Sequence, residues 1–495
     1  MTGDLLIDLI MNASSLWWII LLGTTIGIVI GAIPGFGAHN TIIILLPFTL
    51  AVDITTGLTF MISLYVASHM GGGIPAILLN IPGTGGAAAT TLDGFPMAQQ
   101  GKGQQALVLS FFASTVAGFF TSIIALFATP YLARIAFYLH SVEMVVVMLF
   151  GITLIAVIAS KDMLKGLLSG VVGLLIGGIG ADLIYSAPRA TFGFLELYDG
   201  VPLIPVLIGL FAISEALVML KDDAMVSKEG RSLQSTAWSE TVEGLRMGMS
   251  RLWHVIWTGL LGLGIGAIPG AGASIASFVA YQQSRSFSKD PDGYGKGKPE
   301  GVLAPEAANN GVSSGSLIPL LVIGIPGGST AAVMLVVLTY HGVPLGPRMF
   351  VEVPELAYGV FMTMAFAYLM MIFTILPLTR LLSRVSFVPT SYLAPTIIAF
   401  TLIGAFVYRG YAFDMGLAIV FGIVGYVART TGYQIVGILI GVILGPLLEE
   451  NFIRALRIGE GDLGVFFSTP VANGLWTALV LSLVAPYLLA KFRQR

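Results

Sequence analysis

The chain consists mainly of long apolar segments separated by short polar ones. Nine apolar segments have the roughly 17–25 residues that a membrane-spanning helix requires. They cover 104–130, 142–160, 166–186, 201–220, 349–378, 390–408, 412–428, 432–448 and 470–489. The longest polar stretches, 221–251 and 285–300, are too short for a folded soluble domain. Because open strand edges cannot be hydrogen-bonded in lipid, the pattern predicts an all-α polytopic membrane protein.

Two further apolar segments, 16–50 and 252–284, are each interrupted by glycine and proline. The interruptions, Gly31–Ala38 and Gly266–Ala273, differ at one position and lie 235 residues apart. In the second segment the arms on either side of the interruption have about 14 and 11 residues. At about 1.5 Å per residue they are too short to cross a hydrocarbon core of roughly 30 Å. We therefore predict a re-entrant hairpin in each segment.

A second interrupted segment follows each hairpin, at 57–91 and at 301–339. The same short motifs recur there in the same order. They are Ile74-Pro75, Ile81-Pro82-Gly83 and Gly94-Phe95-Pro96 in the first half, and Ile318-Pro319, Ile325-Pro326-Gly327 and Gly342-Val343-Pro344 in the second. The two proline motifs keep a seven-residue spacing in both halves. Ordered repetition of this kind indicates an internal duplication in which each copy holds a hairpin and a broken helix.

Charged residues orient the two copies. The second hairpin is flanked by loops rich in Lys and Arg, whereas the first is flanked only by Asp4, Asp8 and Asp53. Basic loops favour the cytoplasm, so we predict that the copies are inverted. The predicted domains are a first repeat at 1–220, a cytoplasmic linker at 221–251, a second repeat at 252–448, and a periplasmic loop with an extra C-terminal transmembrane helix at 449–495. A complete span at 16–33 is the alternative for the first hairpin.

Composition excludes several classes of function. Of 495 residues, 56% are hydrophobic and only 10% charged, and the mean hydropathy is +0.91. Soluble domains carry about 25% charged residues. The 24 basic residues against 26 acidic ones provide no basic surplus for nucleic acid. Cysteine is absent, which excludes disulfides and thiolate metal sites. We find no Ser/His/Asp set at the breaks, so an enzyme is not predicted.

The 61 glycines and 24 prolines are unusual in a helical chain. Inverted repeats with interrupted helices are typical of secondary transporters. An interruption leaves N–H groups that attract anions and carbonyl groups that attract cations. Other interpretations apply to single features: Gly173 and Gly177 are more typical of helix packing, and one Ser or Thr can bond to its own helix. For His39, a packing role and a proton-carrying role both stay open, as do structural and functional roles for Glu306.

The chain resembles the large membrane subunit of the tripartite tricarboxylate transporters. The resemblance covers nearly the whole chain. It is carried by Gly31–Ala38, Leu78–Gly83, Asp93–Ala98 with Gly101, Gly266–Ser274, Glu300–Val302, Ala304–Asn310, Ile318–Leu320, Gly324–Gly327, His341-Gly342 and Gly346-Pro347. One departure is Ser68–Gly73, where an aromatic–Gly–Gly–Ser/Thr run is expected. This difference leaves the polar ligands near the first break open.

The resemblance implies a carrier in the bacterial inner membrane that imports small di- or tricarboxylates. It implies coupling to Na⁺ or H⁺, no other cofactor, and two protein partners: a periplasmic substrate-binding protein and a small four-helix membrane subunit. A channel-like or scaffold subunit is the alternative. No ATP-binding motif is present, because Gly295–Pro299 lacks the spacing of a phosphate loop.

We predict that the four breaks meet near the membrane midplane and form the transport site. The predicted substrate-binding residues are Gly35, Gly37, His39, Asn40, Asn80, Gly83, Thr84, Gly270, Gly272, Ser274, Gly327, Ser329 and Thr330. The predicted cation-binding residues, at which Na⁺ is the candidate ion, are Pro34, Gly35, Asn80, Pro269, Gly270, Asn309 and Asn310.

Overall fold

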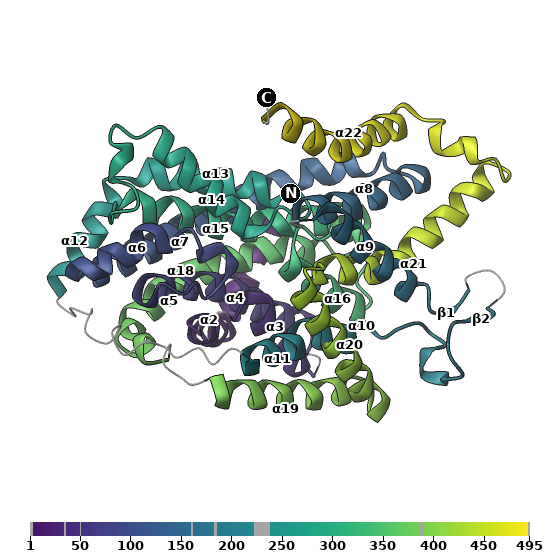
Figure 1. Cartoon of the computed structure of the whole chain (residues 1–495), viewed down its shortest axis with the longest axis horizontal. Coiled ribbons are helices and arrows are strands. Elements are labelled where there is room, and N and C mark those ends of the chain that lie inside the picture. The colour runs from purple at the N-terminus through teal and green to yellow at the C-terminus, as the bar shows by residue number, and fades with distance from the viewer. Residues whose placement is uncertain are drawn as a thin grey trace. The chain divides into compact units, whose positions relative to one another are not determined.

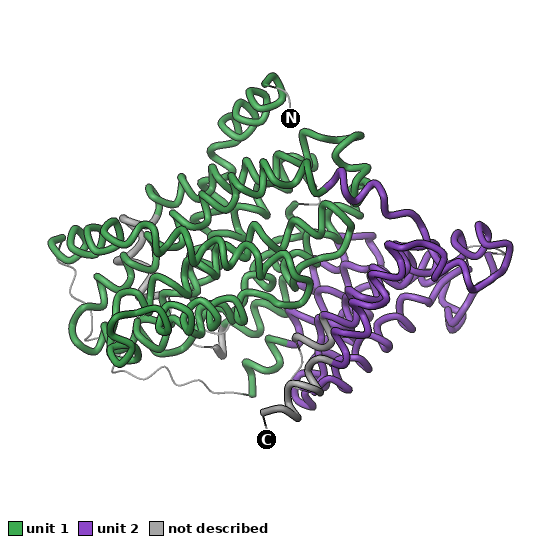
Figure 2. Tube along the Cα trace, turned by 90° about the horizontal axis from the view of Figure 1, so that it is seen from above, with its two compact units in different colours: residues 1–132, 215–400 green, residues 133–214, 401–495 purple. Residues whose placement is uncertain are grey.

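The computed structural model describes residues 3–33, 36–49, 51–159, 162–182, 186–221, 238–385 and 390–493. The chain forms two compact units, each built from two stretches of sequence (Figure 2). Unit 1 consists of residues 1–132 and 215–400, and unit 2 of residues 133–214 and 401–495. Each unit takes residues from both predicted repeats. Compact packing and sequence duplication are different properties, so the predicted repeat boundaries stay a prediction.

The described residues are almost entirely helical (Figure 1). Six helical segments are long and apolar enough to span a membrane: Ile54–Leu79, Thr91–Ala136, Leu203–Lys221, Pro354–Thr374, Ala412–Thr431 and Ile435–Ile458. A seventh candidate is the helix pair Gly3–Ser15 and Trp17–Gly31, which is bent by 61°. The prediction of an all-helical protein with several membrane spans is therefore confirmed. The opposite orientation of the two halves stays a prediction.

Unit 1 contains the four predicted breaks. Its helices in the first half are α1 (Gly3–Ser15), α2 (Trp17–Gly31), α3 (Ala38–Thr49), α4 (Ile54–Gly71), α5 (Gly73–Leu79), η1 (Gly85–Ala87), α6 (Thr91–Met97), the π-helical turn η2 (Ala98–Lys102) and most of α7 (Gly103–Ala136). Those in the second half are most of α11 (Ser214–Lys221), then α12 (Trp238–Met249), α13 (Leu252–Gly266), α14 (Gly272–Ser286), η6 (Pro291–Gly293), α15 (Glu300–Ile323), α16 (Ser329–Tyr340), η7 (Gly346–Arg348), α17 (Met349–Glu352) and α18 (Pro354–Val385). Of the predicted linker at 221–251, residues 222–237 lie outside the described residues, and α12 follows them.

Helix α15 lies in the core of unit 1, and each of its residues from Gly301 to Val322 is buried. It packs against α13 and α14, as α4 packs against α2 and α3 (Figure 1). Glycine allows both close approaches. A Cβ added to Gly31 would lie 2.5 Å from the Ser68 carbonyl oxygen, and one added to Gly266 would lie 2.9 Å from that of Val312. The two hairpins of the predicted duplication therefore contact the following helix in the same way.

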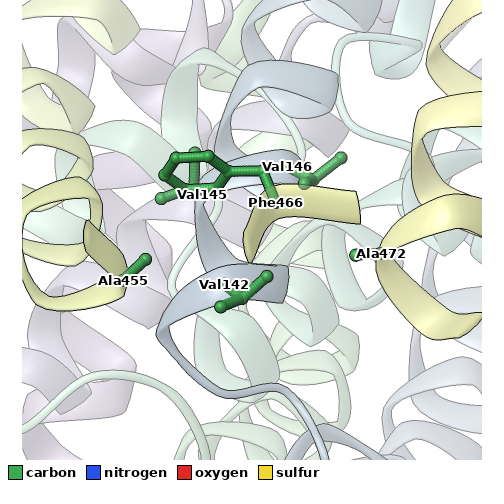
Figure 3. Packing of buried hydrophobic residues seen from close by; sticks show 6 residues of the cluster. All are labelled: Val142, Val145, Val146, Ala455, Phe466 and Ala472. Atoms are coloured by element: carbon green, nitrogen blue, oxygen red, sulfur yellow. The ribbon is translucent and has the colours of Figure 1, made fainter. Parts of the chain in front are cut away.

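Unit 2 holds the remaining helices and one small sheet. Its elements are α8 (Ser141–Ala159), α9 (Met163–Gly177), β1 (Gly180–Ala181), β2 (Pro188–Arg189), η3 (Leu195–Leu197), α10 (Leu203–Leu207), the π-helical turn η4 (Ile208–Ile213), the C-terminal part of α19 (Thr390–Arg409), α20 (Ala412–Thr431), α21 (Ile435–Ile458), η8 (Leu463–Phe467) and α22 (Pro470–Arg493). Figure 3 shows a buried apolar cluster where α8, α21, η8 and α22 meet, formed by Val142, Val145, Val146, Ala455, Phe466 and Ala472.

Two predicted boundaries in unit 2 are wrong. The span predicted at 166–186 ends early, because α9 stops at Gly177 and the chain enters the antiparallel pair β1–β2, with Gly180 opposite Arg189. Gly180 has a φ of +130°, which glycine adopts readily, and Arg189 donates to the Gly178 carbonyl oxygen at 2.6 Å. The loop predicted from residue 449 begins as helix, since α21 continues to Ile458. There Glu449 pairs with Arg189 at 2.8 Å.

The interpretation of Gly173 and Gly177 as packing residues agrees with their place in the structure. Helices α9 and α21 pack side by side. A Cβ on Gly173 would overlap the Ile438 carbonyl oxygen, and one on Gly177 would lie 2.7 Å from that of Val442. Gly441 faces Gly170 across the same seam. These glycines bring two helix backbones together, as small residues do in membrane proteins.

We expect Gly173→Ala to destabilise unit 2, because the added methyl group forces α9 and α21 apart. Overpacking of this kind costs about 1–3 kcal/mol. Thermal unfolding of the purified protein in detergent measures the effect. Gly416→Ala on α20 is the matched control, since a Cβ there meets nothing within 4 Å. Equal melting temperatures for the two variants would contradict the prediction.

Candidate functional site

Glycine and proline lie between the two short helices of each hairpin. In the second hairpin α13 ends at Gly266 and α14 begins at Gly272. Gly270 and Gly272 between them have φ values of +84° and +64°. Residues with a side chain rarely adopt this left-handed backbone conformation, so both positions require glycine. In the first hairpin α2 ends at Gly31 and α3 begins at Ala38, while the predicted site residues Pro34 and Gly35 lie outside the described residues.

The two broken helices end in the same way. Helix α5 ends at Asn80 with a φ of +58°, and α15 ends at Gly324 with a φ of +76°. After each left-handed residue comes the isoleucine of the Ile-Pro-Gly motif. Ile81 donates its N–H to the Pro75 carbonyl oxygen at 3.3 Å, and Ile325 donates to that of Pro319 at 3.3 Å. The repeated proline spacing in the sequence therefore corresponds to a repeated helix ending.

Each break also packs against the hairpin of its own half through the motif glycine. The Gly83 N–H donates to the Gly72 carbonyl oxygen at 3.1 Å, and the Gly327 N–H donates to that of Ser316 at 3.2 Å. A Cβ on Gly83 would lie 2.6 Å from the Gly31 carbonyl oxygen. A Cβ on Gly327 would lie 2.7 Å from that of Gly266. Neither site has room for a side chain.

Contacts between the halves bring the four breaks together within unit 1. The His39 imidazole, at the start of α3, lies 3.4 Å from the Ser329 hydroxyl at the start of α16. On the other side, a Cβ on Gly85 would lie 2.5 Å from the Ser274 hydroxyl at the start of α14. Within the second half, the Gly270 N–H donates to the Gly327 carbonyl oxygen at 3.0 Å. Each hairpin thus contacts the break of the other half as well as its own.

Helix N-termini at this junction have N–H groups without side-chain caps. The residues preceding α14 and α16, Ala271 and Gly328, make no capping hydrogen bond through a side chain. The segments 31–49, 80–92, 266–284 and 324–340 contain no Lys or Arg. The positive potential of these segments therefore comes from backbone N–H groups and helix dipoles. This is an arrangement suited to anions such as carboxylates.

Several predicted polar residues at the junction are buried without hydrogen-bond partners among the described residues. Both amide atoms of Asn40 and the hydroxyl oxygen of Thr84 are unpaired, although these side chains are only 1% and 6% exposed. The adjacent Thr41 hydroxyl is also unpaired. Buried polar groups normally have partners, and each exception requires an explanation. A bound polar ligand would provide those hydrogen bonds.

The predicted cation residues Asn309 and Asn310 belong to a buried hydrogen-bond network. The Asn309 side-chain oxygen lies 2.8 Å from His69 Nδ1, and its amide nitrogen donates to the His69 carbonyl oxygen at 3.3 Å. The Asn310 amide donates to the Glu306 carbonyl oxygen at 3.1 Å, and Tyr368 donates to its side-chain oxygen at 3.3 Å. Both asparagine oxygens therefore already have partners in this structure.

Comparison with known proteins identifies the family. A family profile described as the tripartite tricarboxylate transporter TctA family matches residues 17–440. The chain belongs to this family. It is thus a transporter subunit and a multi-pass membrane protein, not an enzyme, and the family resemblance predicted from the sequence is confirmed.

Two relatives of this TctA-family chain come from Agrobacterium vitis. The "uncharacterized 52.8 kDa protein in TAR-I ttuC' 3'region" is 33% identical over 473 residues, which cover 96% of this chain and 93% of that protein. The "uncharacterized protein in TAR-II ttuC' 3'region" is 37% identical over 211 residues, which cover 43% of this chain and 87% of that protein. No solved structure matches this chain.

The other predicted residues of this TctA-family protein occupy varied positions. Gly37 directly precedes α3, accepts the Asn40 N–H, and faces the His39 ring. Asn80 is exposed and ends α5, so its left-handed backbone explains the choice of asparagine. Ser274 is exposed, whereas Thr330 in the first turn of α16 is buried. Pro269 is half-buried in the second hairpin. The roles assigned to these residues stay predictions.

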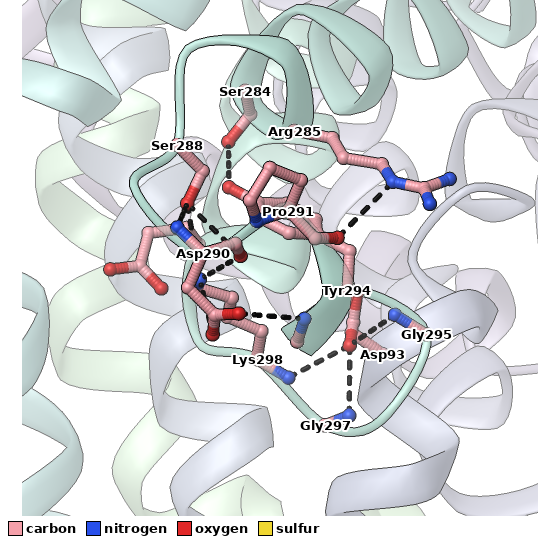
Figure 4. A network of polar contacts seen from close by, with 12 residues as sticks. Asp93, Ser284, Arg285, Ser288, Asp290, Pro291, Tyr294, Gly295, Gly297 and Lys298 are labelled. Atoms are coloured by element: carbon pink, nitrogen blue, oxygen red, sulfur yellow. Dashed lines mark hydrogen bonds and ion pairs between the residues drawn. The ribbon is translucent and has the colours of Figure 1, made fainter.

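Sequence reasoning assigned no role to Asp93, which joins the two halves of unit 1 (Figure 4). This fully buried carboxylate lies on α6. Its Oδ1 accepts N–H groups of Gly295, Gly297 and Lys298 at 2.8–2.9 Å, and its Oδ2 accepts the Tyr281 hydroxyl at 2.8 Å. The available signals were an aspartate inside a family motif and the glycine-rich loop at 295–299, which lacks the spacing of a phosphate loop.

Two further contacts hold the same loop in place. Gln100 donates to the Lys296 carbonyl oxygen at 2.7 Å. Lys298 pairs with Asp290 at 3.0 Å, and this hydrogen bond holds the pKa of the Asp290 carboxyl below its usual value. Figure 4 shows the loop wrapped around the Asp93 carboxylate. The loop after hairpin helix α14 is therefore fixed to the segment that follows the first broken helix.

Proposed function

We propose that this protein is the membrane carrier of a secondary-active, cation-coupled importer of small di- or tricarboxylates. Family membership supports the transporter assignment. The observation that carries the substrate class is the convergence of uncapped helix N-termini at a junction whose segments contain no Lys or Arg. Backbone N–H groups bind carboxylates without placing a permanent positive charge in the membrane.

The proposed route begins with a periplasmic substrate-binding protein that delivers the carboxylate, and a small four-helix membrane subunit completes the complex in the bacterial inner membrane. At the junction, His39, Ser329, Thr84 and Asn40 provide side-chain hydrogen bonds, and the residues around Gly270 and Gly327 provide the backbone. Co-transported Na⁺ or H⁺ neutralises the substrate charge. The break carbonyls, including those near Pro269, remain candidate cation ligands.

Reconstitution of the complete complex into proteoliposomes tests the function. With the binding protein present, an imposed Na⁺ or pH gradient is expected to drive accumulation of a labelled carboxylate above its external concentration. Equilibration without accumulation would favour the channel-like alternative. Absence of any carboxylate flux under both gradients would exclude the proposed substrate class.

Asn40→Leu tests the junction itself. Replacing a buried amide that has no partner by an apolar side chain of similar size is expected to leave stability unchanged or raised. If Asn40 contacts the substrate, the same variant should reduce uptake by about tenfold, the equivalent of roughly 1.4 kcal/mol. Ile42→Leu, on the same helix, is the packing control. Normal uptake by Asn40→Leu would remove this residue from the proposed site.

A further inference from the structure

Glu306 is a carboxylate buried in the core of unit 1. It lies on α15 and is 0% exposed. The Thr90 hydroxyl donates to its Oε1 at 2.6 Å, and the Ser114 hydroxyl donates to its Oε2 at 3.2 Å. Among the described residues it forms no ion pair. Its side-chain partners in the described part of the chain are therefore neutral hydroxyl groups.

An ionised carboxylate in this position is costly unless a cation accompanies it. Transfer of a charge from water into a protein interior carries a penalty of several kcal/mol. Two hydroxyl hydrogen bonds offset part of that penalty and supply no positive charge. The site is thus electrostatically incomplete when only the protein's own groups are counted.

Oxygen atoms of Ser110 and Glu306 lie close to Gly73, the first residue of α5. A Cβ added to Gly73 would be 2.7 Å from the Ser110 hydroxyl oxygen and 3.0 Å from Glu306 Oε1. Ser110 is 0% exposed, and its hydroxyl faces the Glu306 carboxylate without a close hydrogen bond in the described part of the chain. A glycine at 73 therefore lets the start of α5 pack closely against a buried hydroxyl and a carboxylate, which a side chain would push apart.

We propose that Glu306, Ser110, Ser114 and Thr90 form a Na⁺ site that is closed on one side by Gly73. Hard cations take several oxygen ligands at about 2.3–2.6 Å, and the four side chains provide oxygens from α15, α7 and the start of α6. This site consists of side-chain oxygens and differs from the carbonyl sites expected at the breaks.

The Na⁺ site lies directly behind the first break. Gly72, the neighbour of Gly73, contacts Thr84 and accepts the Gly83 N–H through its carbonyl oxygen. Occupancy of the site would therefore hold the junction of α4 and α5 against the residues proposed to bind substrate. If the protein is the cation-coupled carrier proposed above, this proximity assigns the ion at Glu306 as the coupling cation.

Thermal unfolding of the full-length protein in lipid nanodiscs tests the site without transport. NaCl is titrated against choline chloride at constant ionic strength. We expect Na⁺ to raise the melting temperature of the native protein. Ser110→Ala, Gly73→Ala and Glu306→Gln should need about tenfold more Na⁺ or lose the rise. Ser122→Ala on α7 and Gly264→Ala on α13 are matched controls, because neither contacts Glu306.

Two results would overturn the Na⁺ site. One is the absence of a Na⁺-specific rise in the native protein, including a rise that follows pH instead. The other is a Ser110→Ala variant whose melting temperature rises at the same Na⁺ concentration as that of the native protein. Because Ser110→Ala is the mildest variant, this result tests the Na⁺ site even if Glu306→Gln does not fold. Na⁺ stabilisation without carboxylate uptake would retain the ion site and reject the proposed substrate, so the two failures are distinguishable.

Discussion

Gly327→Ala is expected to abolish transport and to lower the stability of unit 1 by at least about 2 kcal/mol. The added Cβ would lie 2.6 Å from the Ser316 Cα and 2.7 Å from the Gly266 carbonyl oxygen. Both neighbours are backbone atoms, which cannot rotate away as a flexible side chain can. The second break must therefore move away from hairpin α13–α14, which breaks the hydrogen bond from Gly270 to Gly327. Uptake in proteoliposomes and melting temperature measure the two effects.

Gly328→Ala is the matched control, one residue further along. Gly328 has an extended backbone with φ of −169°, which any residue adopts, and a Cβ there meets nothing within 4 Å. The Gly328→Ala variant should therefore fold and transport much as the native protein does. Gly83→Ala should reproduce the defect of Gly327→Ala, since its Cβ would meet the equivalent atoms of the first half. If Gly327→Ala transports and unfolds as the native protein does, the close packing of the second break against hairpin α13–α14 is not required for transport or stability.

Asp93→Ala is expected to release the 295–298 loop and to cost at least about 3 kcal/mol. Removal of the carboxylate leaves three loop N–H groups and the Tyr281 hydroxyl without their acceptor in a buried environment. Because the loop follows hairpin helix α14, we also expect faster proteolysis of the loop and slower transport. Melting temperature and limited trypsin digestion at Lys296 report on these changes.

Asp290→Ala is the control for Asp93→Ala. It removes a carboxylate that also pairs with this loop, but this side chain is 67% exposed, and its ion pair with Lys298 is screened by water. Its effect should be much smaller. Asp93→Asn should fall between the two, because the amide keeps one oxygen acceptor. If Asp93→Ala and Asp290→Ala lower the melting temperature equally, the buried hydrogen bonds of Asp93 do not stabilise the loop more than the exposed ion pair does.

The site was partly predictable from the sequence because its breaks are local. Gly and Pro act on their own backbone, so the positions of Ile81-Pro82-Gly83 and Ile325-Pro326-Gly327 could be located without knowledge of neighbours. The predicted ends of spans were less accurate. Helix α9 stops at Gly177 before the β1–β2 turn, and α21 continues to Ile458 with Glu449 paired to Arg189. Neither the turn nor the ion pair is visible as hydropathy.

The sequence by itself determined that this is a helical membrane protein with paired breaks, and it determined the family. Apolar length, the order of repeated motifs and their spacing carry that information along the chain. Tertiary structure decided which break meets which hairpin, that Asn309 is already paired with His69, and that Asp93 holds a loop 200 residues away. It also placed Ser110 beside Glu306. Such contacts depend on the directions of side chains from different helices, which hydrophobic periodicity does not record.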